Sequence, residues 1–188
     1  MTQFEYIAIP YSMVLSFTVL RALSVLPYAV RDGRRYWIHT AWVFLTLMTT
    51  LGMFWNFWFY REIEWTLPLL ALALANPAIL FVFASLLAPT DASATESWRE
   101  YFFSIRLRLF VTGIAWDLSG LAGIFVLADL PASHPANAQL GFMLFAHVVG
   151  AVSKRPGVQA AIVVAGLLGI GLAFAGVVAP APIVATPP

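Results

Sequence analysis

The residue with the clearest chemical potential is Asp117, a carboxylate near the middle of an apolar run from Leu109 to Leu127. A carboxylate at the centre of a membrane helix is unfavourable by roughly 2.5 to 3.5 kcal/mol on insertion scales. It therefore needs a partner, a bound proton or a functional role. Gly113 and Gly120 lie four residues before and three after it, so small residues share its helical face. Asp117 is expected to point into a helix bundle.

Two polar residues in other apolar stretches, Arg21 and Asn76, are candidate partners of Asp117. Helical side chains lean towards the N-terminus, so the guanidinium of Arg21 could reach the depth of Asp117. Snorkelling to the lipid headgroups is the alternative for this side chain. Asn76 precedes Pro77, which has no amide hydrogen and therefore leaves a backbone carbonyl without its helical partner. This position is either a break in the helix that coordinates an ion or a simple packed kink. Asp117, Arg21 and Asn76 together form the predicted buried polar or ion site.

Two histidines, His39 and His147, lie in separate apolar stretches at similar predicted depth. Two such imidazoles could ligate a b-type haem through both axial positions, which would make the protein an electron carrier. The alternative is an ordinary hydrogen-bonding or interfacial role for each histidine. The chain has no cysteine and His134 is expected on the opposite side of the membrane, so no metal site is predicted. Apart from the haem alternative, no cofactor is predicted.

Motifs of soluble enzymes are absent from the sequence, including GxSxG, the Walker loop, HExxH and the dinucleotide-binding glycine pattern. Ser119 lies two residues from Asp117 on the same helix. Residues at that spacing point in different directions, so they do not form a nucleophile and base in register. We therefore assign no catalytic residue and favour a role other than catalysis.

Composition places the chain in a membrane. Of its 188 residues, 61% are hydrophobic and 10% are charged, and the mean hydropathy is +0.86. One soluble core cannot hide that much apolar surface. The net charge of +1 is too small to indicate binding of nucleic acid. The sequence predicts a multi-pass protein of a cell membrane, with a bacterial inner membrane as the expected location and the lipid bilayer as its first partner.

The apolar stretches predict an all-α bundle of about six transmembrane helices in a single domain, residues 1–178. A helix needs roughly 20 residues to cross the hydrocarbon, and only the fifth stretch is clearly short. The last segment, 179–188, is rich in Pro and Ala and is expected to be a disordered tail. The predicted helices are 7–30, 37–60, 65–88, 103–127, 136–153 and 158–178.

Loop charges predict the orientation of the bundle. The even-numbered connections carry only Arg61 as a base, beside Glu62 and Glu64, while the fourth connection has Asp129 and His134. Under the positive-inside rule the odd-numbered connections face the cytoplasm, and both termini lie outside it. The basic residues of the odd connections are Arg31, Arg34, Arg35, Arg99, Arg106, Arg108, Lys154 and Arg155.

Serines in the longest internal connection predict a helix that starts before the fourth span. Ser93 precedes Glu96 by three residues and Ser97 precedes Glu100 by three, which is the capping-box pattern. A short interfacial lead-in to the fourth span is expected.

A small-residue face on the sixth stretch predicts close helix packing. Its members recur every four residues and would let another backbone approach, either within the chain or in a second subunit. We therefore expect a homo-oligomer or a partner in a membrane complex. Three functions are compatible with these features: an ion- or proton-conducting channel or small transporter, a structural or accessory subunit, and the haem carrier. The small-residue face is Ala161, Ala165, Gly169 and Ala173.

Overall fold

The computed structural model describes residues 2–31, 33–127 and 135–176, and these form helices without any strand. The prediction of six helices is confirmed. Five helices are long and apolar enough to cross a membrane, and the fifth in sequence, α5, is shorter. This architecture fits a polytopic helical membrane protein. The elements are α1 (Gln3–Ala29), α2 (Trp37–Asn56), the short 3₁₀ helix η1 (Phe57–Tyr60), α3 (Leu67–Leu87), α4 (Trp98–Leu127), α5 (Pro135–Val152) and α6 (Pro156–Phe174).

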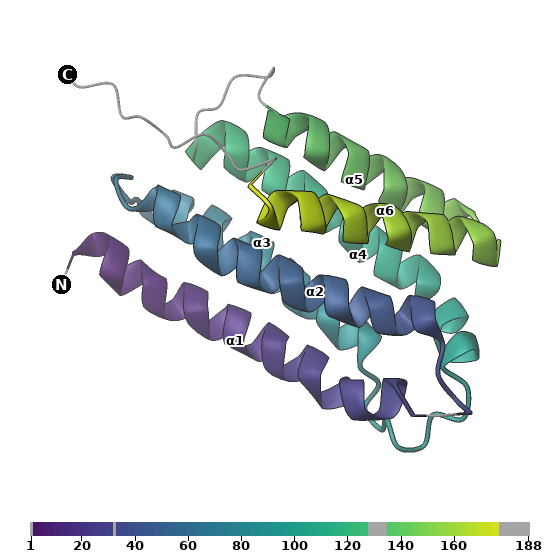
Figure 1. Cartoon of the computed structure of the whole chain (residues 1–188). Coiled ribbons are helices and arrows are strands. Elements are labelled where there is room, and N and C mark those ends of the chain that lie inside the picture. The colour runs from purple at the N-terminus through teal and green to yellow at the C-terminus, as the bar shows by residue number, and fades with distance from the viewer. Residues whose placement is uncertain (1, 32, 128–134, 177–188) are drawn as a thin grey trace.

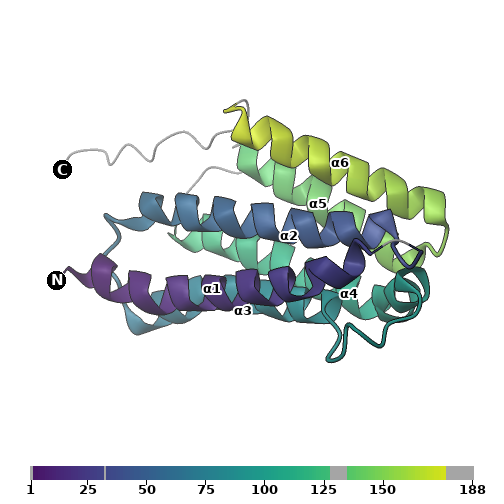
Figure 2. The same cartoon turned by 60° about the horizontal axis from the view of Figure 1, so that its bottom comes forward.

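The six helices run along one common axis and form two layers of three (Figure 1). One layer holds α1, α2 and α6, and the other holds α3, α4 and α5. The central helix of the second layer, α4, packs against both α3 and α5, whereas α6 contacts α2 and α5. The turned view keeps α1 and α6 at opposite edges of the bundle (Figure 2). Asp117, on the central helix α4, is thereby surrounded by protein.

Local sequence signals set several helix ends. Thr2 and Glu5 form a capping box at the start of α1, and Ser97 accepts the amide hydrogen of Glu100 at the start of α4. The helix that Ser97 starts continues without interruption to Leu127. The expected lead-in and the fourth span, expected from residue 103, are one continuous helix.

The other predicted cap in this connection is not formed. Ser93 instead donates its hydroxyl and its amide hydrogen to the carboxylate of Asp91. These hydrogen bonds, with one from the amide of Ala94, lower the pKa of the exposed Asp91 carboxyl because they favour its charged form. Ser93 therefore belongs to an Asp91 turn in the loop.

The start of α1 and the end of α6 lie at the same end of the bundle (Figure 1). An even number of crossings requires this arrangement. The assignment of that end to the non-cytoplasmic side stays a prediction from loop charges. Asp129, His134 and the tail 179–188 lie outside the described residues.

Many exposed side chains along the helices are large and apolar, which fits a helical membrane protein. Leu67 and Val152, for example, are 78% and 79% exposed. Inside the bundle, one apolar cluster surrounds buried Phe102 and Leu109, and another surrounds Tyr11 at the opposite end.

The small-residue face of α6 is not tightly packed within this chain, and its packing against a second subunit stays a prediction. Ala161 is exposed, and a Cβ atom added at Gly169 would meet nothing within 4 Å. The closest approach is made instead by Gly166, where an added Cβ would lie 3.2 Å from the side chain of Leu45 on α2. Ile162 and Val163 direct a neighbouring face of α6 into the core.

Candidate functional site

The buried carboxylate of Asp117 is paired with a histidine. Oδ2 of Asp117 lies 2.6 Å from Nδ1 of His147 on α5, and the two side chains are 0% and 3% exposed. The second carboxylate oxygen, Oδ1, is buried and has no hydrogen-bond partner among the described residues. We refer to these two residues as the Asp117–His147 pair.

Glycines allow α4 and α5 to approach closely enough for the pair to form. A Cβ atom added at Gly113, one turn before Asp117, would lie 2.6 to 2.9 Å from three ring atoms of His147. One added at Gly150, on α5, would lie 2.4 to 2.7 Å from the ring of Phe110 on α4. Real Cβ atoms do not approach so closely, so each glycine holds a ring from the opposite helix against its backbone.

Aromatic rings enclose the imidazole of His147. Trp42 of α2 lies nearly parallel to it, with 5.8 Å between ring centroids and an angle of 27°. Phe83 of α3 and Phe110 of α4 approach at centroid distances of 6.2 and 6.0 Å. The pair therefore lies in an apolar environment, where a net charge is unfavourable.

A cavity of about 350 Å³ lies beside the pair, with lining residues on all six α-helices and on η1. We call it the central cavity. His147 lines it, whereas Asp117 does not. Most of its wall is aromatic, aliphatic or methionine, with a few polar side chains that include Thr46, Asn76 and Gln139. His147 thus lies between the buried carboxylate of Asp117 and the central cavity.

Protonation of the Asp117–His147 pair determines what Nε2 of His147 can do. When the pair is neutral overall, either as carboxylate and imidazolium or as carboxylic acid and imidazole, Nε2 carries a hydrogen and donates. When the pair has lost one proton, the remaining hydrogen lies on Nδ1 towards the carboxylate, so Nε2 can only accept. Loss of one proton from the pair therefore changes Nε2 from a donor into an acceptor.

Asn76 lies at the level of Asp117, as its sequence position predicts, but its amide group bonds to neighbours of Asp117. Nδ2 donates to the carbonyl oxygen of Trp116 at 2.9 Å and to the hydroxyl of Ser119 at 2.6 Å. Asn76 therefore ties α3 to α4 on the cavity wall.

The expected pairing of Arg21 with Asp117 was wrong. The guanidinium of Arg21 donates to the carbonyl oxygen of Ala88, just after the end of α3. The last carbonyl groups of a helix lack partners within it, and such an orphan carbonyl attracts the cation. Arg21 therefore points towards the end of the bundle where α3 finishes, in the direction that the snorkelling alternative predicts.

Two more side chains complete this arrangement around the end of α3. Nε2 of His39 lies 2.9 Å from the carbonyl oxygen of Leu87, and the hydroxyl of Tyr101 donates to that of Leu86 at 2.7 Å. His39 also packs against the ring of Trp98, at 4.6 Å between centroids. Its role is to satisfy the C-terminus of α3.

The structure does not bring His39 and His147 to a common haem site. His147 lines the central cavity and His39 does not. Nε2 of His39 is engaged by the carbonyl oxygen of Leu87, whereas its Nδ1 has no hydrogen-bond partner among the described residues. The lining of the central cavity does not support a haem held by both histidines, and the haem alternative stays a hypothesis from the sequence.

A similar arrangement at the end of α5 was not foreseen from the sequence. Arg106, predicted as an ordinary basic residue of the inner connection, is only 6% exposed. Its Nη1 donates to the carbonyl oxygens of Gly150, Ala151 and Ser153. Nε2 of Gln159 on α6 donates to Gly150 and Ser153. The available sequence signal was a base two turns inside an apolar helix, which needs acceptors at that depth.

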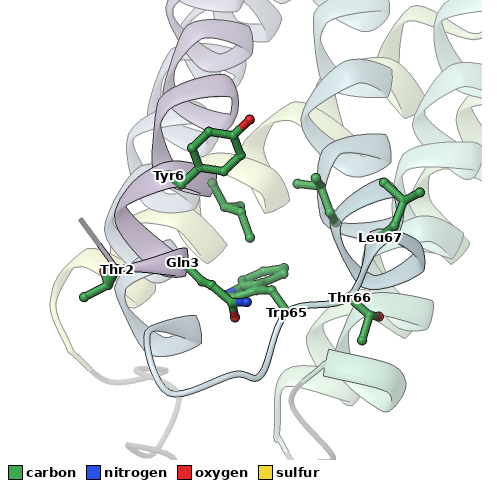
Figure 3. A pocket seen from close by; sticks show the side chains of 8 residues that line it. Thr2, Gln3, Tyr6, Trp65, Thr66 and Leu67 are labelled. Atoms are coloured by element: carbon green, nitrogen blue, oxygen red, sulfur yellow. The ribbon is translucent and has the colours of Figure 1, made fainter.

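A second hollow, of about 400 Å³, lies where α1 and α3 begin and is apart from the pair (Figure 3). Leu67 lies on the opposite wall from Tyr6 (Figure 3). None of the predicted site residues lines it.

Gly113→Ala is expected to lower the free energy of unfolding by about 1–3 kcal/mol, because the new methyl group overlaps the ring of His147. Reversible denaturation in mixed micelles measures the change. Gly123→Ala is the matched control on α4, since its Cβ would meet only Leu127, at 4.0 Å. Equal stability of the two variants would contradict the proposed close contact.

Comparison of the chain with protein-family models, with curated proteins and with solved structures found no match. The function is therefore argued from the site, in a polytopic helical architecture with a buried acid and histidine beside a cavity.

Proposed function

We propose that this protein is a proton-conducting channel or small transporter in which the Asp117–His147 pair binds and releases the proton. One observation carries the proposal. His147 holds the buried carboxylate at 2.6 Å and also lines the central cavity. A proton that arrives through the cavity can thus reach Asp117 through the imidazole ring. Ionisable residues in a membrane core typically mark such relays.

The unpartnered carboxylate oxygen of Asp117 favours a proton that is bound and released over a permanent negative charge. Oδ1 is buried without a partner among the described residues. A full negative charge there would be poorly solvated. The pair is therefore expected to rest in its neutral form and to release a proton only when an acceptor enters the cavity.

Proton uptake into proteoliposomes tests the proposal. A potassium diffusion potential drives uptake, which an enclosed pH-sensitive dye reports. The protein should conduct above protein-free liposomes, and Asp117→Asn and His147→Gln should reduce the rate by at least tenfold, because each removes one member of the relay. Asp91→Asn is the matched control, since this carboxylate is exposed in a loop.

Folding of each variant is verified by its elution as a single species and by its helical content. Wild-type protein that conducts no better than empty liposomes would refute the proposal. A folded Asp117→Asn variant with unchanged flux would refute it as well.

A structural or accessory role in a membrane complex is the second candidate. It is favoured by the dryness of Asp117 itself, which is 0% exposed and held by one histidine. Under that role the pair acts only as a lock between α4 and α5. Substitution would lower stability without affecting any flux, and the native protein would purify with a partner at fixed stoichiometry.

A further inference from the structure

We infer that the central cavity binds a small uncharged ring compound whose carbonyl oxygens accept hydrogen bonds. This ligand class belongs to the same site as the proposed function. Binding of the ligand does not depend on that function, whereas its transport would rest on it. Binding is measured at equilibrium without a gradient. Failure of binding and failure of proton flux are therefore separate results.

The size and enclosure of the cavity suit a small organic molecule. Its volume of about 350 Å³ lies in the range of roughly 300 to 1,000 Å³ that is usual for ligand pockets. All six α-helices contribute to the wall, which carries aromatic rings from Trp42, Phe83, Trp116 and Phe142. Such a wall favours a planar ring, because aromatic groups pack well against flat apolar faces.

The charge of the lining excludes most ionic ligands. Among the described residues, no Asp, Glu, Lys or Arg lines the central cavity, and the titratable groups there are His147 and the hydroxyls of Tyr11 and Tyr60. An ion that left water for this space would have no opposite charge in contact with it. The expected ligand is therefore neutral.

Two unused hydrogen-bond donors belong to residues of the cavity wall. The indole nitrogens of Trp42 and Trp116 are buried and have no hydrogen-bond partner among the described residues. Trp42 is only 4% exposed. An indole N–H can donate but cannot accept. Buried donors of this kind call for an acceptor, which a ligand or a water molecule must supply.

His147 provides a third donor when the Asp117–His147 pair is neutral, because Nε2 then carries a hydrogen. Nδ1 is engaged by Asp117 at 2.6 Å, so Nε2 is the ring nitrogen left for a molecule in the cavity. The Nε2–H of His147 in the cavity, two unpartnered indole N–H groups of wall residues and the lack of charged side chains among the described lining residues favour a carbonyl compound. An alcohol or amine would have to direct its own hydrogen atoms at these donors.

Binding and protonation are coupled at this nitrogen. Loss of one proton from the pair turns Nε2 into an acceptor that faces the lone pairs of the carbonyl oxygen, so affinity should fall as pH rises. No ionisable residue lies on α3 or α6. The other titratable and charged groups near the pair are His39 on α2, bound to Leu87, Arg106 on α4, bound to Gly150, and the hydroxyls of Tyr11 and Tyr60.

A matched pair of probes tests the inference on the unmodified protein. Duroquinone and durene share a tetramethyl ring, but only duroquinone has carbonyl oxygens. Equilibrium dialysis against the protein in nanodiscs, corrected with empty nanodiscs, measures binding of each. Duroquinone should bind saturably, and at least tenfold more tightly than durene. Equal affinities, or no saturable binding of either probe, would overturn the inference and leave water as the occupant.

Variants then test the two indole donors. Trp42→Phe and Trp116→Phe keep an aromatic ring but remove the N–H, and each should weaken duroquinone binding by about tenfold, the equivalent of 1.4 kcal/mol. Trp55→Phe is the matched control, because Trp55 is 78% exposed and does not line the cavity. Folded variants of Trp42 and Trp116 that both bind duroquinone like the wild type would also overturn the inference.

Discussion

Asp117→Ala should lower the free energy of unfolding by about 3–5 kcal/mol, the range found when one partner of a buried ionic pair is removed. His147 is 3% exposed and its Nδ1 has Asp117 as its hydrogen-bond partner. Without the carboxylate, the imidazole remains buried with an unsatisfied nitrogen beside a new void. Both effects destabilise the native state. Reversible denaturation in mixed micelles, followed by helical content, measures the loss.

A double-mutant cycle separates the pair from the cavity left by truncation. Asp117→Leu with His147→Leu replaces both polar groups by apolar ones and should be more stable than the sum of the two single variants predicts. Leu118→Ala is the control on the same helix, because Leu118 is 52% exposed and faces outward. Additive effects of the two leucine substitutions would contradict a direct interaction.

Arg106→Met should lower the free energy of unfolding by about 3 kcal/mol, because it leaves buried carbonyl oxygens at the end of α5 without their charged donor. A hydrogen bond to a charged group contributes roughly 1.5–3 kcal/mol, and Arg106 donates to three carbonyls. Methionine keeps most of the unbranched side chain, so lost packing is small. The same denaturation assay measures the change.

Arg108→Met is the matched control for this prediction. Arg108 lies two residues further along α4 and is exposed, so its substitution should change stability by less than about 0.5 kcal/mol, as is usual for surface positions. Gln159 continues to donate to Gly150 and Ser153 in the Arg106 variant. Equal stability of the two methionine variants would show that the carbonyls at the end of α5 do not depend on Arg106.

The helices themselves could be predicted from the sequence because they depend on the length and hydropathy of each apolar stretch. A backbone in lipid must satisfy its own hydrogen bonds, so each long apolar stretch becomes a helix. Helix ends with a side-chain cap were also readable, as Ser97 before α4 illustrates. The lead-in that Ser97 predicts continues into the fourth span as α4, because no residue breaks the helix between them.

The partner of Asp117 could not be predicted because it depends on helix contacts rather than on depth. The sequence made Arg21 a candidate partner and His147 a possible haem ligand, whereas in the structure α4 packs against α5 and α3, and α1 packs against α2 and α3. Gly113 decides the contact, since its missing side chain admits the ring of His147. The sequence shows where the glycine is, but it does not show which helix packs against it.

The sequence by itself determined the solvent, the number of helices and the presence of an inward-facing acid, since these follow from hydropathy and from small residues beside Asp117. Only the tertiary structure decided that this acid meets His147, that Arg21 and His39 serve the end of α3, and that a cavity adjoins the pair. The physical reason is that the free energy of burying a helix in an apolar environment depends on the residues of that helix alone. Hydrogen-bond partners between helices depend on which faces pack together.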